Sequence, residues 1–205
     1  LCAELAADDG KQLLATELGV SVDSLARLGV ICLPGFSLWP ERSADGTIIG
    51  ICDRYPDGTK KQEAGTKRGL TFCEGWHEIP GPVLLPEGGS DTAAALTMGL
   101  CAVGRPSNSG GLDLLVPLLR QLSPDREILV LGENDRKPHD SLSESIRVRH
   151  DSDCEGCSRC WPGKWGAILI VKELSDRLCR KIGWCFPPSG AKDIREWLRL
   201  SEERP

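Results

Sequence analysis

Acidic side chains recur directly after short apolar segments in the second half of the sequence. Carboxylates are hard oxygen ligands, and Mg²⁺ binds a few of them together with waters and substrate phosphates. An ion held in this way stabilises the charge that develops in phosphoryl transfer and lowers the pKa of an attacking hydroxyl. The candidate metal ligands are Glu87, Asp91, Glu133, Asp135 and Asp193.

The first acidic pair lies in the segment Pro-Glu-Gly-Gly-Ser-Asp, after the apolar residues 83–85. Those residues predict a short buried strand, and Gly88 and Gly89 predict a tight turn. We expect Ser90 to cap the helix that follows. This places Glu87 at the carboxyl end of a strand, which is where open α/β sheets bind their ligands.

The rest of this half alternates strand and helix patterns in the order βαβαβαβα. Such an order predicts an α/β fold with a mostly parallel four-stranded sheet flanked by helices. The carboxyl ends of parallel strands share one edge, so we expect the five acids to meet there. One such acid alone is more often a helix cap or a solvated turn residue, and their joint placement favours the metal site. The predicted strands are 83–85, 100–103, 128–131 and 184–186, and the predicted helices are 91–98, 113–122, 165–182 and one containing Ile194, Trp197 and Leu198.

Residues 1–79 have a different pattern. Two short helices are expected in residues 1–28, with a break near Gly19, and turn residues such as Pro56-Asp57-Gly58 separate β-rich segments. We therefore expect a small helical and antiparallel β subdomain, joined near residue 80 to a second domain of residues 80–205.

Basic residues gather near the end of this first subdomain. A flexible basic segment can follow nucleic-acid phosphates, although a charge cluster beside a hairpin is more often a solvated face. The candidate phosphate-binding residues are Arg54, Lys60, Lys61, Lys67 and Arg68.

The composition is that of a globular protein of 205 residues, with a formal net charge of −5. This charge argues against binding nucleic acid through bulk charge, although acids in a metal site can mask a local basic surface. The sequence has no apolar segment long enough to span a bilayer and no secretory signal, so we expect a cytoplasmic protein without a membrane partner. Because the chain begins with Leu, we expect a piece of a longer protein.

Three of the ten cysteines, each separated by two residues, lie in the polar interval 136–164. Three thiolates and a histidine can hold a tetrahedral structural Zn²⁺. The alternatives are an iron–sulfur site completed by a distant cysteine, or a loop with free thiols or an adventitious disulfide. The candidate zinc ligands are Cys154, Cys157, Cys160 and His150, with His139 as another fourth ligand.

Taken together, three acidic segments resemble those of the Toprim domain, which primases, topoisomerases and some nucleases share. The resemblance covers about residues 80–200 and implies the Toprim fold and phosphodiester chemistry with Mg²⁺. Glu133 stands where the family usually has Asp, which leaves Mg²⁺ or Mn²⁺ open. The interval 136–164 resembles an insertion. The matching segments are Pro86 to Asp91, Glu133-Asn134-Asp135 and Pro187 to Asp193.

The first 80 residues resemble the β-rich subdomain that precedes Toprim in phage and plasmid primase-helicases. This resemblance implies a DNA primase that makes RNA primers, with Glu87, Glu133 and Asp135 as catalytic residues and Asp91 and Asp193 assisting. The implied partners are a single-stranded DNA template, nucleoside triphosphates and a replicative helicase or helicase domain. A Toprim nuclease and a non-catalytic DNA-binding module are the alternatives. The chain has no P-loop motif of its own.

Overall fold

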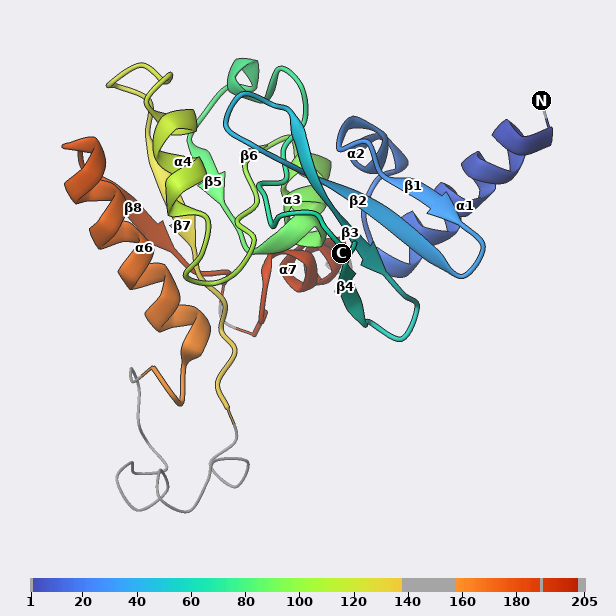
Figure 1. Cartoon of the computed structure of the whole chain (residues 1–205). Helices are drawn as coiled ribbons and strands as arrows, with labels where there is room; N and C mark the ends of the chain where they lie inside the picture. The colour runs from blue at the N-terminus through green and yellow to red at the C-terminus, as the bar shows by residue number, and fades with distance from the viewer. Residues whose placement is uncertain (1, 138–157, 189, 203–205) are drawn as a thin grey trace.

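The computed structural model describes residues 2–137, 158–188 and 190–202, with side chains for 9–137, 158–188 and 190–201 (Figure 1). Two four-stranded sheets form its frame. The first is an antiparallel meander in the order β1-β2-β3-β4, as expected from the hairpin signals. Its elements and those that accompany it are α1 (Cys2–Leu18), α2 (Val22–Arg27), β1 (Ile31–Leu33), β2 (Phe36–Arg42), β3 (Ile48–Arg54), β4 (Lys60–Gln62) and the 3₁₀ helix η1 (Trp76–Glu78).

The second sheet is entirely parallel, with strand order β6-β5-β7-β8, which confirms the predicted α/β class. Its central strands are continuous apolar runs, as is usual for strands covered on both faces. Its elements are β5 (Val83–Leu85), α3 (Gly88–Thr97), β6 (Cys101–Ala102), α4 (Leu112–Leu119), β7 (Ile128–Leu131), α6 (Pro162–Leu178), β8 (Gly183–Cys185) and α7 (Ile194–Glu202).

The direction in which successive strands are added to the sheet reverses between β5 and β7. From β5 the chain moves outward to β6, and it then crosses back over β5 to reach β7 and β8. Right-handed crossovers in opposite directions place helices on opposite faces, and α3 accordingly contacts α7 while α4 contacts α6. The point between β5 and β7 is therefore a topological switch point, the usual ligand-binding position in such sheets.

Short bridges join the two sheets. Thr71 and Gly104 exchange backbone hydrogen bonds of 3.0 and 2.8 Å, and one hydrophobic core includes residues of both sheets and of the helices around them. The antiparallel sheet lies before residue 80 and the parallel sheet after it, but the domain division itself stays a prediction. No helix in the described residues is long and apolar enough to cross a membrane.

Two prolines lie inside regular elements. Pro40 lies within β2, because β1 pairs only as far as Leu38 and leaves that side of β2 free at Pro40. Gly111, with φ +88°, caps α4, and Pro117 lies in the interior of this helix on its exposed side. Helix α6 begins three residues before the predicted start and ends four residues before the predicted end.

Candidate active site at the switch point of the parallel sheet

The first acidic segment turns sharply from β5 into α3. Gly88 has φ +76°, which favours glycine, and a Cβ atom at Gly89 would lie 2.6 Å from the indole of Trp39. Glu87 is the N-cap residue of α3, but its side chain caps no amide, so its carboxylate is left for the site. The expectation that Ser90 caps this helix was wrong, because Ser90 lies within its first turn.

The second acidic segment follows β7 and is held from two sides. Asn134 donates side-chain hydrogen bonds of 3.2 and 2.9 Å to the carbonyls of Pro187 and Ala191, which brings the third acidic segment beside β7. The Gly163 amide, in the first turn of α6, donates a hydrogen bond of 2.9 Å to Asp135 Oδ1. Asn134 and Gly163 are thus positioning residues that the sequence patterns did not single out.

Asp193, in the third segment, has two structural partners. Its Oδ1 accepts a hydrogen bond of 2.8 Å from the Glu196 amide and so caps α7, while its Oδ2 lies 3.9 Å from Arg195 Nη2. Asp193 therefore does act as a helix cap, which is the common role of a single acid at such a position. Asp193 is also 7% exposed and close enough to Asp91 to raise the pKa of that carboxyl.

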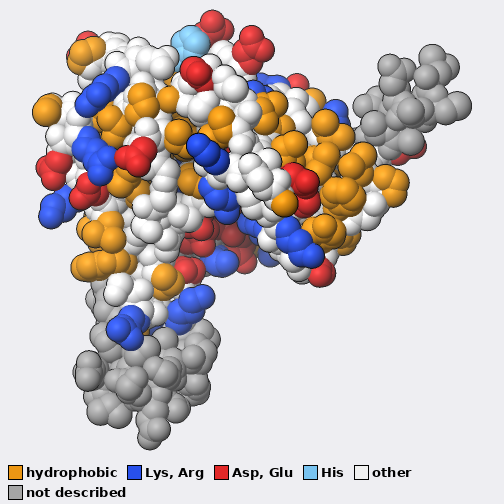
Figure 2. Space-filling model, viewed as in Figure 1, with side chains coloured by type: hydrophobic (Ala, Val, Ile, Leu, Met, Phe, Trp, Pro, Cys, Tyr) orange, Lys and Arg blue, Asp and Glu red, His pale blue; other side chains and the backbone are white. Residues whose placement is uncertain are grey.

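The acids form one electrostatic cluster, and Figure 2 shows acidic side chains in a recess bordered by Lys and Arg. Burial, and then the charges of Asp193 and Glu133, raise the pKa of Asp91 well above its ordinary value, with Arg195 and Lys60 opposing. Burial, and then the charge of Glu87, also raise the pKa of Glu133. The structure thus brings predicted acids of all three segments close enough together for their charges to interact.

Within residues 2–137, 158–188 and 190–202, no group of three or more His, Cys, Asp or Glu side chains forms a ready-made metal cage. The donor set nevertheless fits Mg²⁺ or Mn²⁺, because its members are carboxylates whose mutual repulsion a divalent cation would relieve. Mg²⁺ is commonly bound by one or two carboxylates, waters and substrate phosphates rather than by an all-protein cage. The assignment of particular ligands stays a prediction.

A buried cation, Arg105, lies close to the acids. Its side chain is 1% exposed, and its Nε and Nη2 each donate a hydrogen bond of 3.0 Å, to the carbonyls of Leu85 and Leu131. Burial lowers the pKa of Arg105 to about 10, although the charges of Glu87 and Glu133 favour its protonated form. No sequence pattern singles out this residue, whose only signal is an arginine in the loop after the predicted strand 100–103.

A cleft of about 280 Å³ lies between the antiparallel sheet and the start of α3. Of the five predicted phosphate-binding residues, Arg54, Lys60 and Arg68 line this cleft together with Glu87. Arg68 is already engaged: its Nε contacts both carboxylate oxygens of Glu41 at 2.9 and 3.1 Å, and its Nη2 donates to a backbone carbonyl.

The other two predicted residues lie outside the lining of this cleft. Lys61 points away from Lys60 along β4, and its Nζ lies 5.3 Å from the centroid of the Tyr55 ring. Lys67 is exposed, and its backbone pairs with Ile49 of β3. The periodicity of an extended strand thus separates Lys60 from Lys61, although the two are adjacent in sequence.

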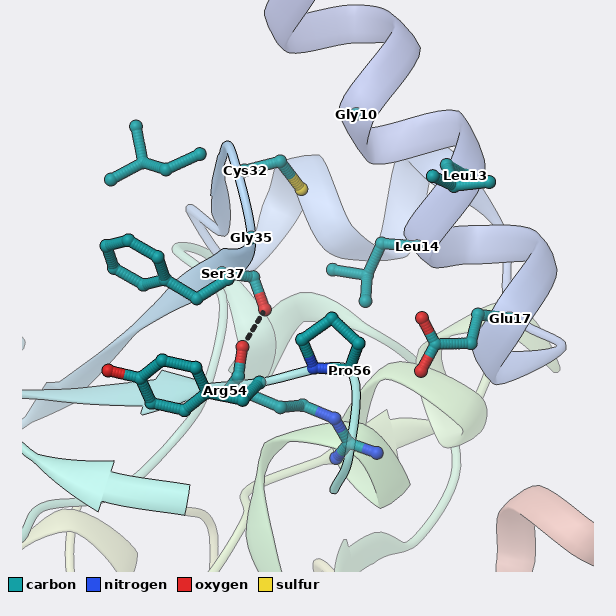
Figure 3. A pocket seen from close by; sticks show the side chains of 12 residues that line it. Gly10, Leu13, Leu14, Glu17, Cys32, Gly35, Ser37, Arg54 and Pro56 are labelled. Carbon is teal, nitrogen blue, oxygen red and sulfur yellow. Dashed lines mark hydrogen bonds between the residues drawn. The ribbon is translucent and has the colours of Figure 1, made fainter. Parts of the chain in front are cut away.

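Arg54 connects the cleft to a second, smaller pocket of about 130 Å³ between α1 and the antiparallel sheet. Figure 3 shows that Arg54 and Glu17 point toward one another at one end of this pocket, below Leu14. Burial, followed by the nearby charge of Arg195, lowers the pKa of Arg54, and Asp91 and Glu17 oppose this shift. Arg54 therefore faces both the acids and the pocket.

Most of the predicted zinc site lies outside the described residues, including His139, His150, Cys154 and Cys157. Cys160 is described and buried, and its carbonyl accepts a hydrogen bond of 2.8 Å from the Lys137 amide. This bond joins the two described ends that flank residues 138–157, close to Asp135. The zinc assignment stays a prediction.

No family model and no curated protein matches the sequence. Solved structures do match, and they show that the chain has the fold of a DNA primase catalytic core. The primase fragment of the bacteriophage T7 primase-helicase is 15% identical, with a TM-score of 0.54 over 92% of this chain and 70% of that one. The E. coli primase catalytic core is 16% identical, with a TM-score of 0.59 over 96% and 73%.

A third structure, a DnaG primase catalytic domain bound to single-stranded DNA, is 16% identical. It has a TM-score of 0.61 over 92% of this chain and 67% of that one. Both sheets of the chain thus have counterparts in primase cores, as the resemblance implied.

Proposed function

We propose that the chain is a primase-type nucleotidyltransferase core that synthesises RNA primers on single-stranded DNA. The observation that carries this proposal is the cleft in which Arg54 and Lys60 face Glu87 at the switch point of the parallel sheet. One of the proposed metal ligands, Glu87, thus lines the same cavity as two cations that could bind phosphate. A nuclease of the same fold would not need the antiparallel sheet that supplies Arg54 and Lys60.

In this proposal Glu87, Glu133 and Asp135 hold Mg²⁺ or Mn²⁺, and Asp91 and Asp193 assist. The bound ion would neutralise charge on the reacting phosphates and lower the pKa of the attacking 3′-hydroxyl. In each step, that oxygen bonds to the α-phosphorus of the incoming nucleotide and pyrophosphate leaves. A replicative helicase, or a helicase domain of a longer chain, is the proposed partner.

The protein's own residues orient the reactants. Arg54 and Lys60 would contact template or triphosphate oxygens, and Trp39 holds the antiparallel sheet against the turn that carries Glu87. The Gly163 amide and the Asn134 side chain hold the second acidic segment. Such preorganisation reduces the entropy that must be lost on reaching the transition state.

The test is RNA primer synthesis by the full chain on single-stranded DNA, with the four nucleoside triphosphates and Mg²⁺ or Mn²⁺. Glu87→Gln, which keeps the shape but removes the charge, should abolish the product. Glu74→Gln, at an exposed acid outside the cleft lining, is the matched control and should retain it. Absence of any product that depends on Glu87 would contradict the proposal.

Two further assays on the same proteins separate the alternatives. Nicking of DNA in the presence of metal but without nucleotides would identify a nuclease. Salt-dependent DNA binding that survives Glu87→Gln, with no metal-dependent turnover, would identify a binding module.

A further inference from the structure

Arg105 lies close to the acids, and its backbone is hydrogen-bonded to the first acidic segment. Its amide donates a hydrogen bond of 2.9 Å to the Pro86 carbonyl, and its carbonyl accepts one of 2.8 Å from the Gly88 amide. Glu87 thus lies between two residues that are hydrogen-bonded to Arg105. A displacement of Arg105 would move the turn that presents Glu87.

The Arg105 side chain makes equivalent contacts with two strands. Leu85 ends β5 and Leu131 ends β7, and each of their carbonyls accepts a hydrogen bond of 3.0 Å from the guanidinium. Each strand then carries its acid two residues further on, Glu87 after Leu85 and Glu133 after Leu131. The planar guanidinium therefore spans the switch point and links the two strand ends that carry these acids.

Satisfying backbone carbonyls at strand ends does not by itself require a charged group. Burying a full positive charge is costly unless other charges or hydrogen bonds compensate it. The acids that face Arg105 are Glu87, Glu133 and Asp91, and their charges favour its protonated form. Because electrostatic interactions are reciprocal, Arg105 also reduces the repulsion among those acids.

We propose that Arg105 is a positioning residue of the acidic site, whose guanidinium fixes the β5 and β7 ends relative to each other and places a positive charge beside Glu87 and Glu133. This inference rests on the proposed function, because it makes Arg105 a support for the metal-binding acids. Lysine would keep the charge but lose the rigid, planar set of donors. Methionine would lose both.

The test compares Arg105→Lys and Arg105→Met with wild type in the full chain. Arg126→Met is the matched control, because Arg126 also donates to a backbone carbonyl, that of Ile79, but lines a pocket away from the acids. Binding of Mn²⁺ alone is measured by electron paramagnetic resonance of the free ion. Amide hydrogen exchange at Gly88 and Gly132, near the ends of β5 and β7, reports the position of the strand ends without metal.

We expect Mn²⁺ affinity to fall by about tenfold or more in Arg105→Lys, which displaces the acids but keeps the charge. It should fall by a smaller factor in Arg105→Met, because losing a positive charge beside the acids by itself favours cation binding. Exchange at Gly88 and Gly132 should accelerate in both variants, while exchange at Val83, at the other end of β5, should not change. The control should behave as wild type does. If Arg105→Met does not fold, Arg105→Lys decides the question.

A folded Arg105→Lys with wild-type exchange rates and a Mn²⁺ affinity within about twofold of wild type would overturn the inference. Failure of both variants to fold would also overturn it, since Arg105 would then be a residue of the core rather than of the site. If wild type binds no Mn²⁺, the metal-dependent function fails instead. The exchange rates would then still decide whether Arg105 positions the strand ends.

Discussion

Gly163 lies directly against Asp135. Its amide donates a hydrogen bond of 2.9 Å to the carboxylate, and a Cβ atom at this position would lie 2.8 Å from Asp135 Oδ1 and 2.9 Å from Glu133 Cβ. The first turn of α6 thus fixes the positions of Asp135 and Glu133. Glycine is required here because a side chain would collide with these acids, and not for its backbone conformation, which is that of a regular helix.

Gly163→Ala should therefore reduce primer synthesis strongly, by about a hundredfold, because a shift of reacting groups by about 1 Å can have this effect. Helix propensity alone would favour alanine at this position. Gly10→Ala is the matched control, because its Cβ would lie 2.9 Å from Cys32 Cβ, away from the acids. Initial rates and circular dichroism of both variants check the prediction, and equal activities of the two would contradict it.

Asp91→Asn should stabilise the metal-free protein at neutral pH. Burial and neighbouring acids raise the pKa of Asp91, so the folded state retains this proton to a higher pH than the unfolded chain does. The stability that Asp91 contributes is therefore complete below its unfolded pKa and is lost as the pH rises through its folded pKa. Asparagine, which stays neutral, avoids that loss.

Thermal unfolding from pH 4 to pH 8 in the presence of a chelator measures this effect. We expect Asp91→Asn to melt several degrees above wild type at pH 8 and the difference to shrink toward pH 4. Added Mg²⁺ should stabilise wild type more than the variant, because a ligand that binds the folded state raises its stability. Asp125→Asn, at an exposed loop position, is the control, and a lower melting temperature of Asp91→Asn at pH 8 would disprove the prediction.

Arg54→Gln and Lys60→Gln should each weaken binding of single-stranded DNA and make it less dependent on salt. Loss of one phosphate contact to a single strand reduces the slope of log K against log salt by about 0.7. Lys61→Gln and Lys67→Gln remove the same charge outside the cleft lining, so they serve as controls. Fluorescence anisotropy at several salt concentrations gives the slopes, and wild-type slopes for Arg54→Gln and Lys60→Gln would show that Arg54 and Lys60 are not phosphate ligands.

Protein purified without chelator should contain about one equivalent of zinc, because three thiolates and a histidine are a sufficient ligand set for a closed tetrahedral site. Cys154→Ser and Cys157→Ser should lose it, whereas Cys179→Ser, at an exposed cysteine on the end of α6, should not. Elemental analysis gives the metal content. Less than about 0.1 equivalent of zinc or iron in wild type would rule out a metal site in this segment.

The sequence alone predicted the class of fold and the acidic candidates, because both depend on local patterns. Apolar runs followed by glycine and carboxylate identify strand ends, and their alternation with helical segments predicts a parallel sheet. These signals lie within a few residues of each other, as in the segment from Val83 to Asp91. The sequence also indicated the basic candidates, but it did not show which of them face the cleft.

Tertiary structure decided which of those residues act together, because contacts between distant segments follow from strand order and not from local pattern. The order β6-β5-β7-β8 brings Arg105 close to both Glu87 and Glu133, and the pleat of β4 turns Lys60 toward the cleft and Lys61 away. Gly163 likewise became a site residue only when α6 packed against β7. A sequence pattern thus indicates the chemistry, whereas packing determines its geometry.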